Sequence, residues 1–195
     1  MRTREQHNEW RRKQILQIAL DEFIAKGYHG ASTREICKKA DVSSGLMFHY
    51  FDSKQTLYEA LIEIGCEGMT LECEHEDSPI QSLGRMLSET LLMITTQPFA
   101  ARMFVFMGSA TYNAAQISPR AGEMLALHDI TRQSIPLIEK GQSLGEIRRG
   151  DAHALSVAFW CSIQGIAEAI ALAPETPCPD AEWVLDILRN REGSQ

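Results

Sequence analysis

The chain has 195 residues, of which 44% are hydrophobic, and it carries a formal net charge of −7. This apolar content is enough for an ordinary core, which excludes a disordered chain. The first residues contain no apolar signal segment, the apolar run at 156–173 is interrupted by Gln164 and Glu168, and the five cysteines form no CxxC pair. We therefore expect a soluble, cytoplasmic protein with no membrane span, disulfide framework or structural zinc site.

Charge is distributed unevenly along the chain. Residues 1–60 hold 10 Lys or Arg and 8 Asp or Glu, giving +2, whereas residues 61–195 hold 9 and 18, giving −9. A basic first part can bind phosphates even though the whole chain is acidic. A charge of +2 is also typical of an ordinary solvated surface, so charge alone leaves both interpretations open.

Four helices are predicted in the first 65 residues. Apolar residues at three- and four-residue spacing predict an amphipathic helix over 8–26, and Gly27 is expected to stop it. The next helices are predicted at about 33–40, 44–50 and 53–65, each behind a serine or threonine that can cap it. Together they predict a compact head.

The rest of the chain is predicted to be helical as well. A Glu-rich segment that ends at Pro79 predicts a connector, so we place the boundary between two domains, 1–65 and 66–195, at its start. The later helices are predicted at 79–97, 98–112, 119–142, 151–173 and 180–190. No stretch alternates with period two, so the fold class is all-α, with about nine helices.

The most informative run covers residues 27–57. Its two short helices are joined by a tight turn, and Ile36, Ala40, Val42 and Leu46 are expected to lock them at a steep angle. The second of these helices is then left with an outward face that suits contacts to a DNA groove and to phosphates. The residues that we expect to contact DNA are Thr33, Arg34, Ser43, Ser44, Gly45, Met47, Phe48, His49, Tyr50 and Lys54.

Further positive charges lie on either side of this run. Lys38, Lys39 and Lys54 are candidate phosphate anchors. The amino-terminal arm could follow the phosphates or enter a minor groove, but it could also be a solvated tail. The aromatic cluster has two interpretations as well, because Phe48, Tyr50 and Phe51 could seal the head against the first helix.

This run resembles the amino-terminal signature of the TetR (tetracycline repressor) family of bacterial regulators. The residues that match in order and spacing are Gly27, Tyr28, Thr33, Ile36, Ala40, Val42, Ser43, Gly45, Leu46, Phe48, His49, Tyr50, Phe51, Lys54 and Leu57. The family usually has Gly where Asp41 stands and often has Tyr where Phe48 stands. Asp41 tolerates a left-handed turn, whereas Phe48 has no hydroxyl to donate to a phosphate. The resemblance covers residues 10–62 and, further along, the 145–151 loop.

The resemblance implies a dimeric transcriptional regulator that binds a palindromic, double-stranded DNA operator and is released by a small effector. The first domain would be the helix-turn-helix head, and the second would bind the ligand and form the homodimer. The sequence supports the dimer independently, because the helix predicted at 151–173 is apolar nearly all round and must be covered on more than one face. Trp183, Val184, Ile187 and Leu188 give the last helix an apolar stripe.

Methionines and a few polar groups in the second domain suit a hydrophobic effector, although each of them could instead be plain core packing. The residues that we expect to line the ligand site are Met86, Met103, Met107, Tyr112, Met124, His128, Trp160 and Gln164.

Other functions stay open. Cys66, Glu67, Cys73 and His75 could bind a metal or sense oxidants, although their spacing is not a usual ligand pattern. A helical adaptor could use the same head without binding DNA. The sequence contains no Gly-rich phosphate loop, nucleophile elbow or HExxH motif, so we expect no catalysis, no cofactor and no metal.

Overall fold

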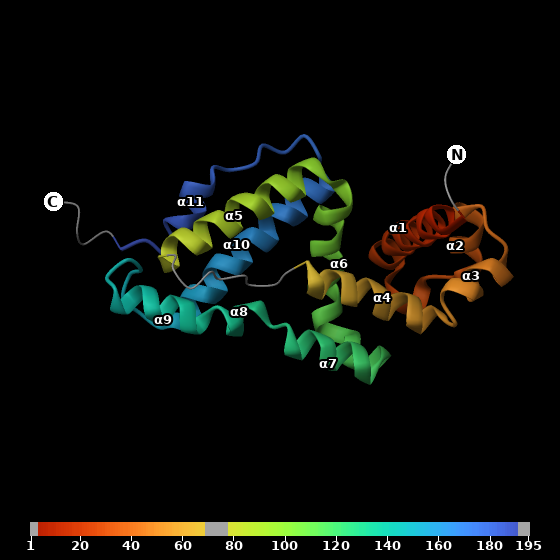
Figure 1. The fold of residues 1–195 in the computed structure, drawn as a ribbon, viewed down its shortest axis with the longest axis horizontal. Helices are drawn as coiled ribbons and strands as arrows, with labels where there is room; N and C mark the ends of the chain where they lie inside the picture. The colour runs from red at the N-terminus through yellow and green to blue at the C-terminus, as the bar shows by residue number, and fades with distance from the viewer. Residues whose placement is uncertain (1–3, 69–77, 191–195) are drawn as a thin grey trace. The chain divides into compact units, whose positions relative to one another are not determined.

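The computed structural model describes residues 4–68 and 78–190. Across these residues it contains helices α1 to α11 and no strand, with one isolated bridge between Ile147 and Arg189 (Figure 1). The predicted all-α fold class is confirmed. The chain divides into two compact units, one of Met1–Gly68 with Phe106–Ala126 and the other of Met69–Val105 with Leu127–Gln195. This division differs from the predicted single boundary because residues 106–126 join the head.

The first unit begins with four helices where four were predicted. They are α1 (Arg4–Gly30), α2 (Thr33–Ala40), α3 (Ser44–Tyr50) and α4 (Lys54–Glu67). Gly27 adopts a φ of 67°, which a residue with a side chain rarely adopts, and it breaks α1 instead of ending it. The buried side chains of the head come from all four helices, and they include Ile15, Leu20, Phe23, Ile36, Met47, Phe51, Leu57 and Leu61.

Serine side chains fix where the short helices start. The Ser43 hydroxyl accepts the N–H of Leu46 at 3.1 Å, and the Ser53 hydroxyl accepts the N–H of Thr56 at 3.0 Å. Each bond satisfies an N–H that has no partner inside its helix, which stabilises the helix start by about 1 kcal/mol. The predicted caps of α3 and α4 are therefore confirmed, whereas Ser32 at the start of α2 makes no side-chain capping hydrogen bond.

Two more helices, α6 (Pro98–Ile117) and α7 (Pro119–Leu127), contribute residues to the first unit. The Tyr58 ring packs edge-on against Phe23 and Phe106, with centroids 5.3 and 5.2 Å apart. The buried Glu59 carboxylate accepts a short hydrogen bond from the Ser118 hydroxyl. These contacts attach residues 106–126 to α4 and explain why they belong to the head.

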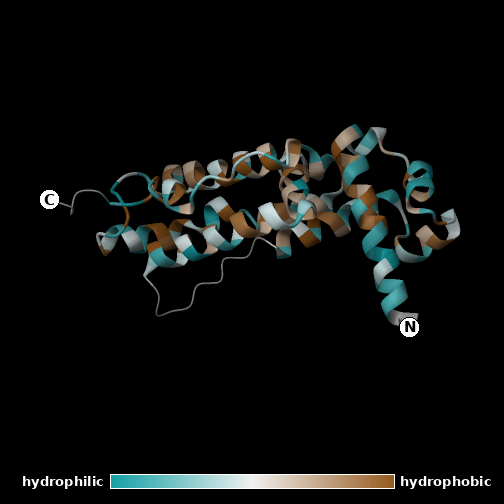
Figure 2. Cartoon of the chain, turned by 90° about the horizontal axis from the view of Figure 1, so that it is seen from above, coloured by the Kyte–Doolittle hydropathy of each residue, from teal (hydrophilic) through white to brown (hydrophobic). Residues whose placement is uncertain are grey.

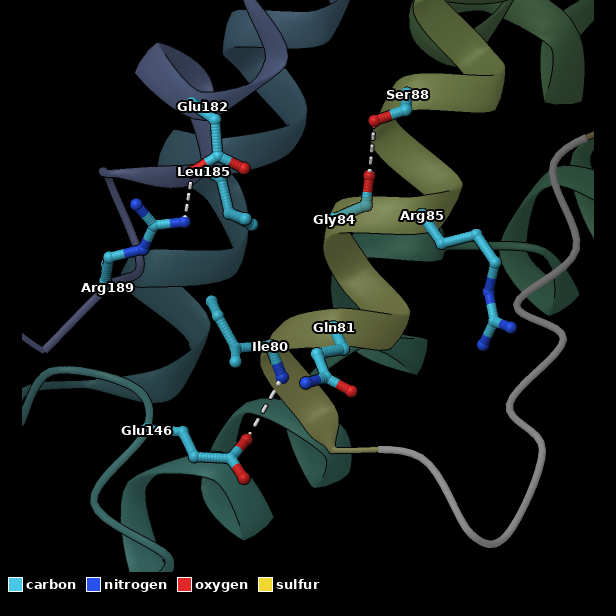
Figure 3. Close-up of a pocket in the computed structure, with 9 residues that line it drawn as sticks. All are labelled: Ile80, Gln81, Gly84, Arg85, Ser88, Glu146, Glu182, Leu185 and Arg189. Carbon is cyan, nitrogen blue, oxygen red and sulfur yellow. Dashed lines mark hydrogen bonds and ion pairs between the residues drawn. The ribbon is translucent and has the colours of Figure 1, made fainter.

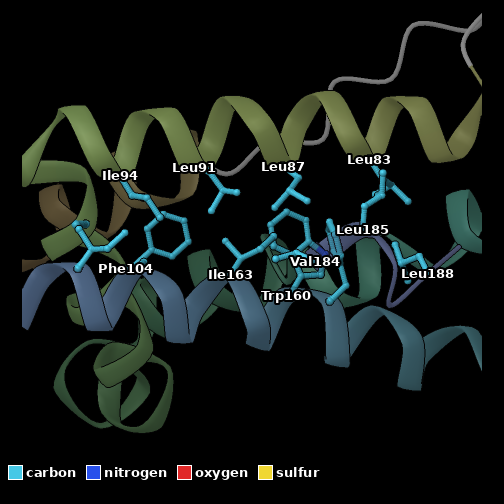
Figure 4. Packing of buried hydrophobic residues seen from close by; sticks show 14 of the residues in the cluster. Leu83, Leu87, Leu91, Ile94, Phe104, Trp160, Ile163, Val184, Leu185 and Leu188 are labelled. Carbon is cyan, nitrogen blue, oxygen red and sulfur yellow. The ribbon is translucent and has the colours of Figure 1, made fainter. Parts of the chain in front are cut away.

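The second unit is built on α5 (Pro79–Thr96) and α10 (Ala152–Leu172), with α8 (Ile130–Gln133), α9 (Ile135–Ser143) and α11 (Ala181–Leu185) packed around them. Figure 4 shows leucines of α5 directed towards Trp160 and Ile163 of α10. Complete burial of a leucine contributes roughly 1.5–3 kcal/mol, so this layer is the main source of stability in the unit. By length and composition α10 could cross a membrane, but its inward face is part of this core.

Several predicted helices have different bounds in the structure, and α1 and α6 are longer than the predicted 8–26 and 98–112. The prediction of one helix at 119–142 is wrong, because the chain there forms α7, α8 and α9. Asp129 caps α8 by accepting the N–H groups of Thr131 and Arg132, and Pro136 occupies the first turn of α9, where its missing N–H costs nothing. The last helix is shorter than predicted and ends at Leu185.

Candidate nucleic-acid interface

The turn between α2 and α3 sets the direction of α3. Asp41 ends α2 in the left-handed conformation, with a φ of 51°, as the sequence indicated. The N–H of Val42 then bonds the Cys37 carbonyl at 3.1 Å, and Ser43 opens α3. The Met47 sulfur lies 3.4 Å from the Cys37 sulfur, inside the head. This tertiary contact fixes which side of α3 faces inward.

The observed register of α3 corrects two predictions. Met47 is completely buried, whereas Leu46 is 36% exposed. Neighbouring residues of a helix lie 100° apart, so only one of the two can point into the core. The interpretation of Leu46 as a packing residue and of Met47 as a DNA contact was therefore wrong, because Met47 packs in the core and Leu46 lies at the surface.

The exposed face of α3 follows from this register. Gly45 and His49 lie opposite Met47 and are exposed, and Phe48, which is 44% exposed, lies on one side of them. Most of the other residues expected to contact DNA are also at the surface. Arg34, Ser43 and Ser44 are exposed, and Thr33 and Tyr50 are half-buried.

Two aromatic residues of the cluster hold α3 in place. The Tyr50 hydroxyl donates a hydrogen bond to the Asn8 side chain of α1 at 3.2 Å. Phe51 is buried, and the Arg12 guanidinium lies 5.3 Å from its ring centroid. The interpretation that Phe51 seals the head is thus confirmed, whereas the exposed Phe48 does not contribute to the seal.

Lys54 has a different place from the one expected. Its amine donates to the backbone carbonyls of Tyr28 at 2.8 Å and Ala31 at 3.0 Å, and it lies 4.5 Å from the centroid of the Tyr28 ring. These carbonyls end α1, where a lysine is a favourable partner. We therefore reassign Lys54 from phosphate contact to positioning the start of α4 against α1.

The remaining cations of the head divide into paired and exposed ones. Lys26 and Lys39 both bind the buried carboxylate of Glu22, the Lys26 contact at 2.9 Å. Hydrogen bonds from Lys39 first and then from Lys26 lower the pKa of Glu22 below its ordinary value. Arg34 and Lys38 are exposed on α2 and are better placed to meet a phosphate.

The amino-terminal arm is partly described. Figure 2 shows that the first turns of α1 are hydrophilic. Arg11 lies 4.9 Å from the Trp10 ring centroid, and Lys13 pairs with Glu9 at 2.9 Å. Arg2 lies outside the described residues. The backbone of the arm is thus helical from Arg4 onward, and its side chains from Gln6 to Trp10 are exposed, so the described part is a solvated helix.

The residues expected to line a ligand site are divided between the two units. Met107, Tyr112 and Met124 belong to the first unit, and the other five, Met86, Met103, His128, Trp160 and Gln164, belong to the second. Tyr112 is 86% exposed, so the prediction that it lines a cavity is wrong. Trp160 is buried and donates its indole N–H to the Ser134 hydroxyl at 2.8 Å. Gln164 donates to the Phe104 carbonyl at 2.9 Å.

The second unit also contains an open pocket that the sequence did not predict. It has a volume of about 310 Å³ and lies between α5, α11 and the 145–151 loop (Figure 3). The lining residues are Ile80, Gln81, Gly84, Arg85, Ser88, Glu146, Glu182, Leu185 and Arg189, none of them an expected ligand residue. Arg189 pairs with Glu182, and Glu146 accepts the Ile80 N–H at 3.3 Å. These segments are distant in sequence, and their only sequence signal was the resemblance of the 145–151 loop.

The redox and metal interpretation finds no support among the described residues. Cys66 is buried, and burial, followed by the nearby Glu63 and Glu67 carboxylates, raises the pKa of its thiol to about 11. Because the thiolate is the reactive form, this cysteine is poorly suited to sensing oxidants. No group of three His, Cys, Asp or Glu that could hold a metal occurs in 4–68 and 78–190. Cys73 and His75 lie outside the described residues.

Residues 15–61, which run from the first buried turn of α1 into α4, match the family model of bacterial regulatory proteins of the tetR family. Over this segment the chain is similar to the TetR family. It is 31% identical over 94 residues to the HTH-type transcriptional regulator UidR of Escherichia coli K12, and this match covers 48% of the chain and 47% of UidR. The chain thus spans about half the length of this curated relative. These matches confirm the resemblance seen in the sequence.

Two longer matches extend the likeness beyond the head. The chain is 27% identical over 168 residues to the HTH-type transcriptional regulator RutR of Escherichia coli K12, covering 81% of the chain and 74% of RutR. The crystal structure of a TetR-like transcriptional regulator from Rhodococcus sp. RHA1 matches with a TM-score of 0.69 and 21% identity, covering 91% of this chain and 92% of that one. The latter supports the fold over nearly the whole chain.

Proposed function

We propose that this protein regulates transcription by binding a palindromic DNA operator as a homodimer. The observation that carries the proposal is the exposed face of α3, which lies inside the segment that matches the family model. Curated relatives of the chain are named as HTH-type transcriptional regulators, which supports the same function.

The head supplies two kinds of contact to DNA. The outward face of α3, with Gly45 and His49 at its centre, enters the major groove and reads base edges. Arg34 and Lys38 on α2 contact phosphates and set the position of the head on the duplex. The acidic remainder of the chain stays away from the phosphates, since its charge of −9 would be repelled.

The dimer is proposed to form through one side of α10, which we call the α10 face. Apart from Glu168, which lies within it, this face is made of exposed residues that are small or apolar: Ala154, Val157, Ala158, Cys161, Gly165, Ala169 and Leu172. A stripe of this kind allows two helices to approach closely and removes apolar surface from water. Two such protomers would place their α3 helices on half-sites about 34–36 Å apart, one helical turn of DNA.

An effector is the remaining part of the proposal. A small hydrophobic compound would release the operator, but only if it binds the DNA-free state more tightly than the DNA-bound one. Of the residues expected to line such a site, Met86 packs against the buried cluster of the second unit and Gln164 is half-buried, and we propose both as candidates. A compound that binds tightly and leaves operator affinity unchanged would contradict this part. The regulator would act in the cytoplasm, where it meets the operator.

The test of the proposed function is selection of bound fragments from random duplex DNA, followed by affinity measurements at several salt concentrations. We expect a palindrome with half-sites about one helical turn apart, and an affinity that falls steeply as salt rises. Failure to enrich any sequence, with weak binding at low salt, would overturn the proposal and favour the helical adaptor.

A further inference from the structure

Two large apolar side chains of α3 are exposed and do not belong to the buried core of the head. Leu46 and Phe48 are the only exposed large apolar side chains in α2, α3 and α4, all of which the structure describes. Met47, which stands between them in the sequence, is completely buried. The core of the head is therefore filled by Met47, and Leu46 and Phe48 face outward.

The geometry of α3 places these two side chains on opposite sides of the outermost row of the helix. With Met47 pointing inward and 100° between successive residues, Gly45 and His49 form the outermost row of the helix. Leu46 and Phe48 flank this row on opposite sides. A Cβ at Gly45 would meet no atom closer than the Ser43 Oγ at 4.0 Å, so the fold itself does not require glycine there. The missing side chain instead lets an outside surface approach the backbone.

The chemistry of the surroundings identifies that surface. The helix α2 that packs against α3 carries the exposed cations Arg34 and Lys38, and this charge suits a groove edged by phosphates better than it suits an apolar protein partner. The apolar group that a major groove offers is the 5-methyl of thymine, which apolar side chains contact. Phe48 has no hydroxyl, so its ring can make this contact but cannot donate to a phosphate.

We infer that Leu46 and Phe48 read thymine methyl groups, one on each side of the base pair that faces Gly45 and His49. The inference rests on the proposed DNA binding, and it adds that each half-site must contain thymine. Each half-site then carries thymine at two positions, which can lie on different strands.

The first test replaces the thymines of the selected operator, one at a time, by deoxyuridine. This change removes one methyl group and keeps the base pair. We expect the affinity of the unaltered protein to fall roughly fourfold at each of two thymines per half-site, the loss that corresponds to exposing one apolar carbon. Equal affinity at every position would overturn the inference, while tight binding to the selected sequence would still uphold the proposed function.

The second test assigns each methyl to a side chain. Phe48→Ala and Leu46→Ala remove exposed groups and leave the buried core of the head unchanged. We expect each variant to lose its response to deoxyuridine at one thymine and to keep it at the other. The control Asp52→Ala, at an exposed residue of the head that is not expected to contact DNA, keeps both responses. Full responses in both variants would mean that the methyl effect arises from DNA shape, which overturns the assignment. A selection that enriches no sequence would instead overturn the proposed function.

Discussion

Two helices of this protein, α3 and α10, expose apolar side chains, and the comparison between them shows how surroundings determine what such a face binds. On α3 the apolar side chains of Leu46 and Phe48 are exposed, and the neighbouring helix α2 carries the exposed cations Arg34 and Lys38. On the α10 face the exposed residues are mostly small, and Val157, which is 39% exposed, is among its largest. The first face suits a groove edged by phosphates, and the second suits a helix of a second copy.

The comparison also shows that an exposed apolar side chain indicates a binding face only when the opposite side of its helix already fills the core. In α3 the inward side is satisfied by Met47 and Phe51, and in α10 it is satisfied by Phe159, Trp160 and Ile163. Because each helix already buries one apolar side in the core, we propose that its second apolar side binds a partner outside the chain. The predictions that follow test each side separately.

The largest effect is expected for the buried side of α3. Met47→Ala should lower the free energy of unfolding by about 2–5 kcal/mol, because it leaves a cavity in a completely buried position. Leu46→Ala should lower it by less than about 1 kcal/mol, since that side chain is exposed. Urea unfolding of both variants measures the difference. Equal losses would show that the two residues do not have opposite roles.

A single charge introduced on the α10 face should weaken the dimer. Val157→Asp would bury a carboxylate against the second copy and should weaken the dimer by about 2 kcal/mol or more, which is roughly a thirtyfold rise in Kd. Sedimentation velocity over a concentration series measures this change. Leu144→Asp, at an exposed leucine outside the α10 face, is the matched control and should leave the Kd unchanged. A dimer that tolerates Val157→Asp would place its interface elsewhere.

Lysines of the head should separate into two classes. Lys54→Met removes the amine from the Tyr28 and Ala31 carbonyls and should lower the free energy of unfolding by about 1–2 kcal/mol. Lys38→Gln should leave stability unchanged and reduce the steepness of the salt dependence of operator affinity by about 0.9 per phosphate contact. Chemical unfolding and salt titration distinguish them. If Lys54→Met leaves the free energy of unfolding unchanged, the assignment of Lys54 as a positioning residue is contradicted and a phosphate contact is favoured.

A methyl group at the centre of the α3 face should have opposite effects on stability and binding. Gly45→Ala should raise the free energy of unfolding by up to about 1 kcal/mol, because alanine is the better helix former and has room inside the fold. It should also weaken operator binding by keeping the helix away from the groove. Thermal unfolding and DNA titration of one preparation test both statements. Unchanged operator affinity would mean that Gly45 does not face the DNA.

The smallest effect is expected from Glu22. Its pKa is lowered in the folded state, so it contributes stability above the ordinary value of 4.5 and loses that contribution as the pH falls through the folded value. Glu22→Gln should remove at most about 1 kcal/mol at neutral pH, since both lysine partners are partly exposed, and should flatten the loss of stability below pH 4.5. Unfolding midpoints at pH 7, 5 and 3.5 measure this. If stability falls with pH equally in Glu22→Gln and in the unaltered protein, the stabilising role of the ionised Glu22 is contradicted.

The head could be predicted from sequence almost completely, because its signals are local. Ser43 and Ser53 cap helices that start where the sequence places them, and Asp41 supplies the left-handed turn. The phase of α3 could not be predicted. A helix of seven residues has only two turns, and Leu46 and Met47 are equally apolar, so the contact of Met47 with Cys37 decides between them.

Tertiary contacts explain the other differences as well. Lys54 matches the family pattern, but its contacts to two carbonyls join segments more than twenty residues apart, which no local pattern reveals. Tyr112 is predicted among the methionines and polar groups of a ligand site, but its position on α6 is exposed. The breaks after α7 did have local signals, Asp129 and Pro136, which outweigh the apolar spacing of 119–142.

The central claim is that the exposed face of α3 reads base sequence, and the most direct test compares operators selected by two proteins. Fragments bound from random duplex DNA would be sequenced for the unaltered protein and for His49→Ala, whose exposed side chain lies at the centre of that face. We predict the same palindrome and half-site spacing for both proteins, with specificity relaxed in the variant only at the base pair that faces His49. An identical motif for both proteins, with equal affinity, would contradict the account.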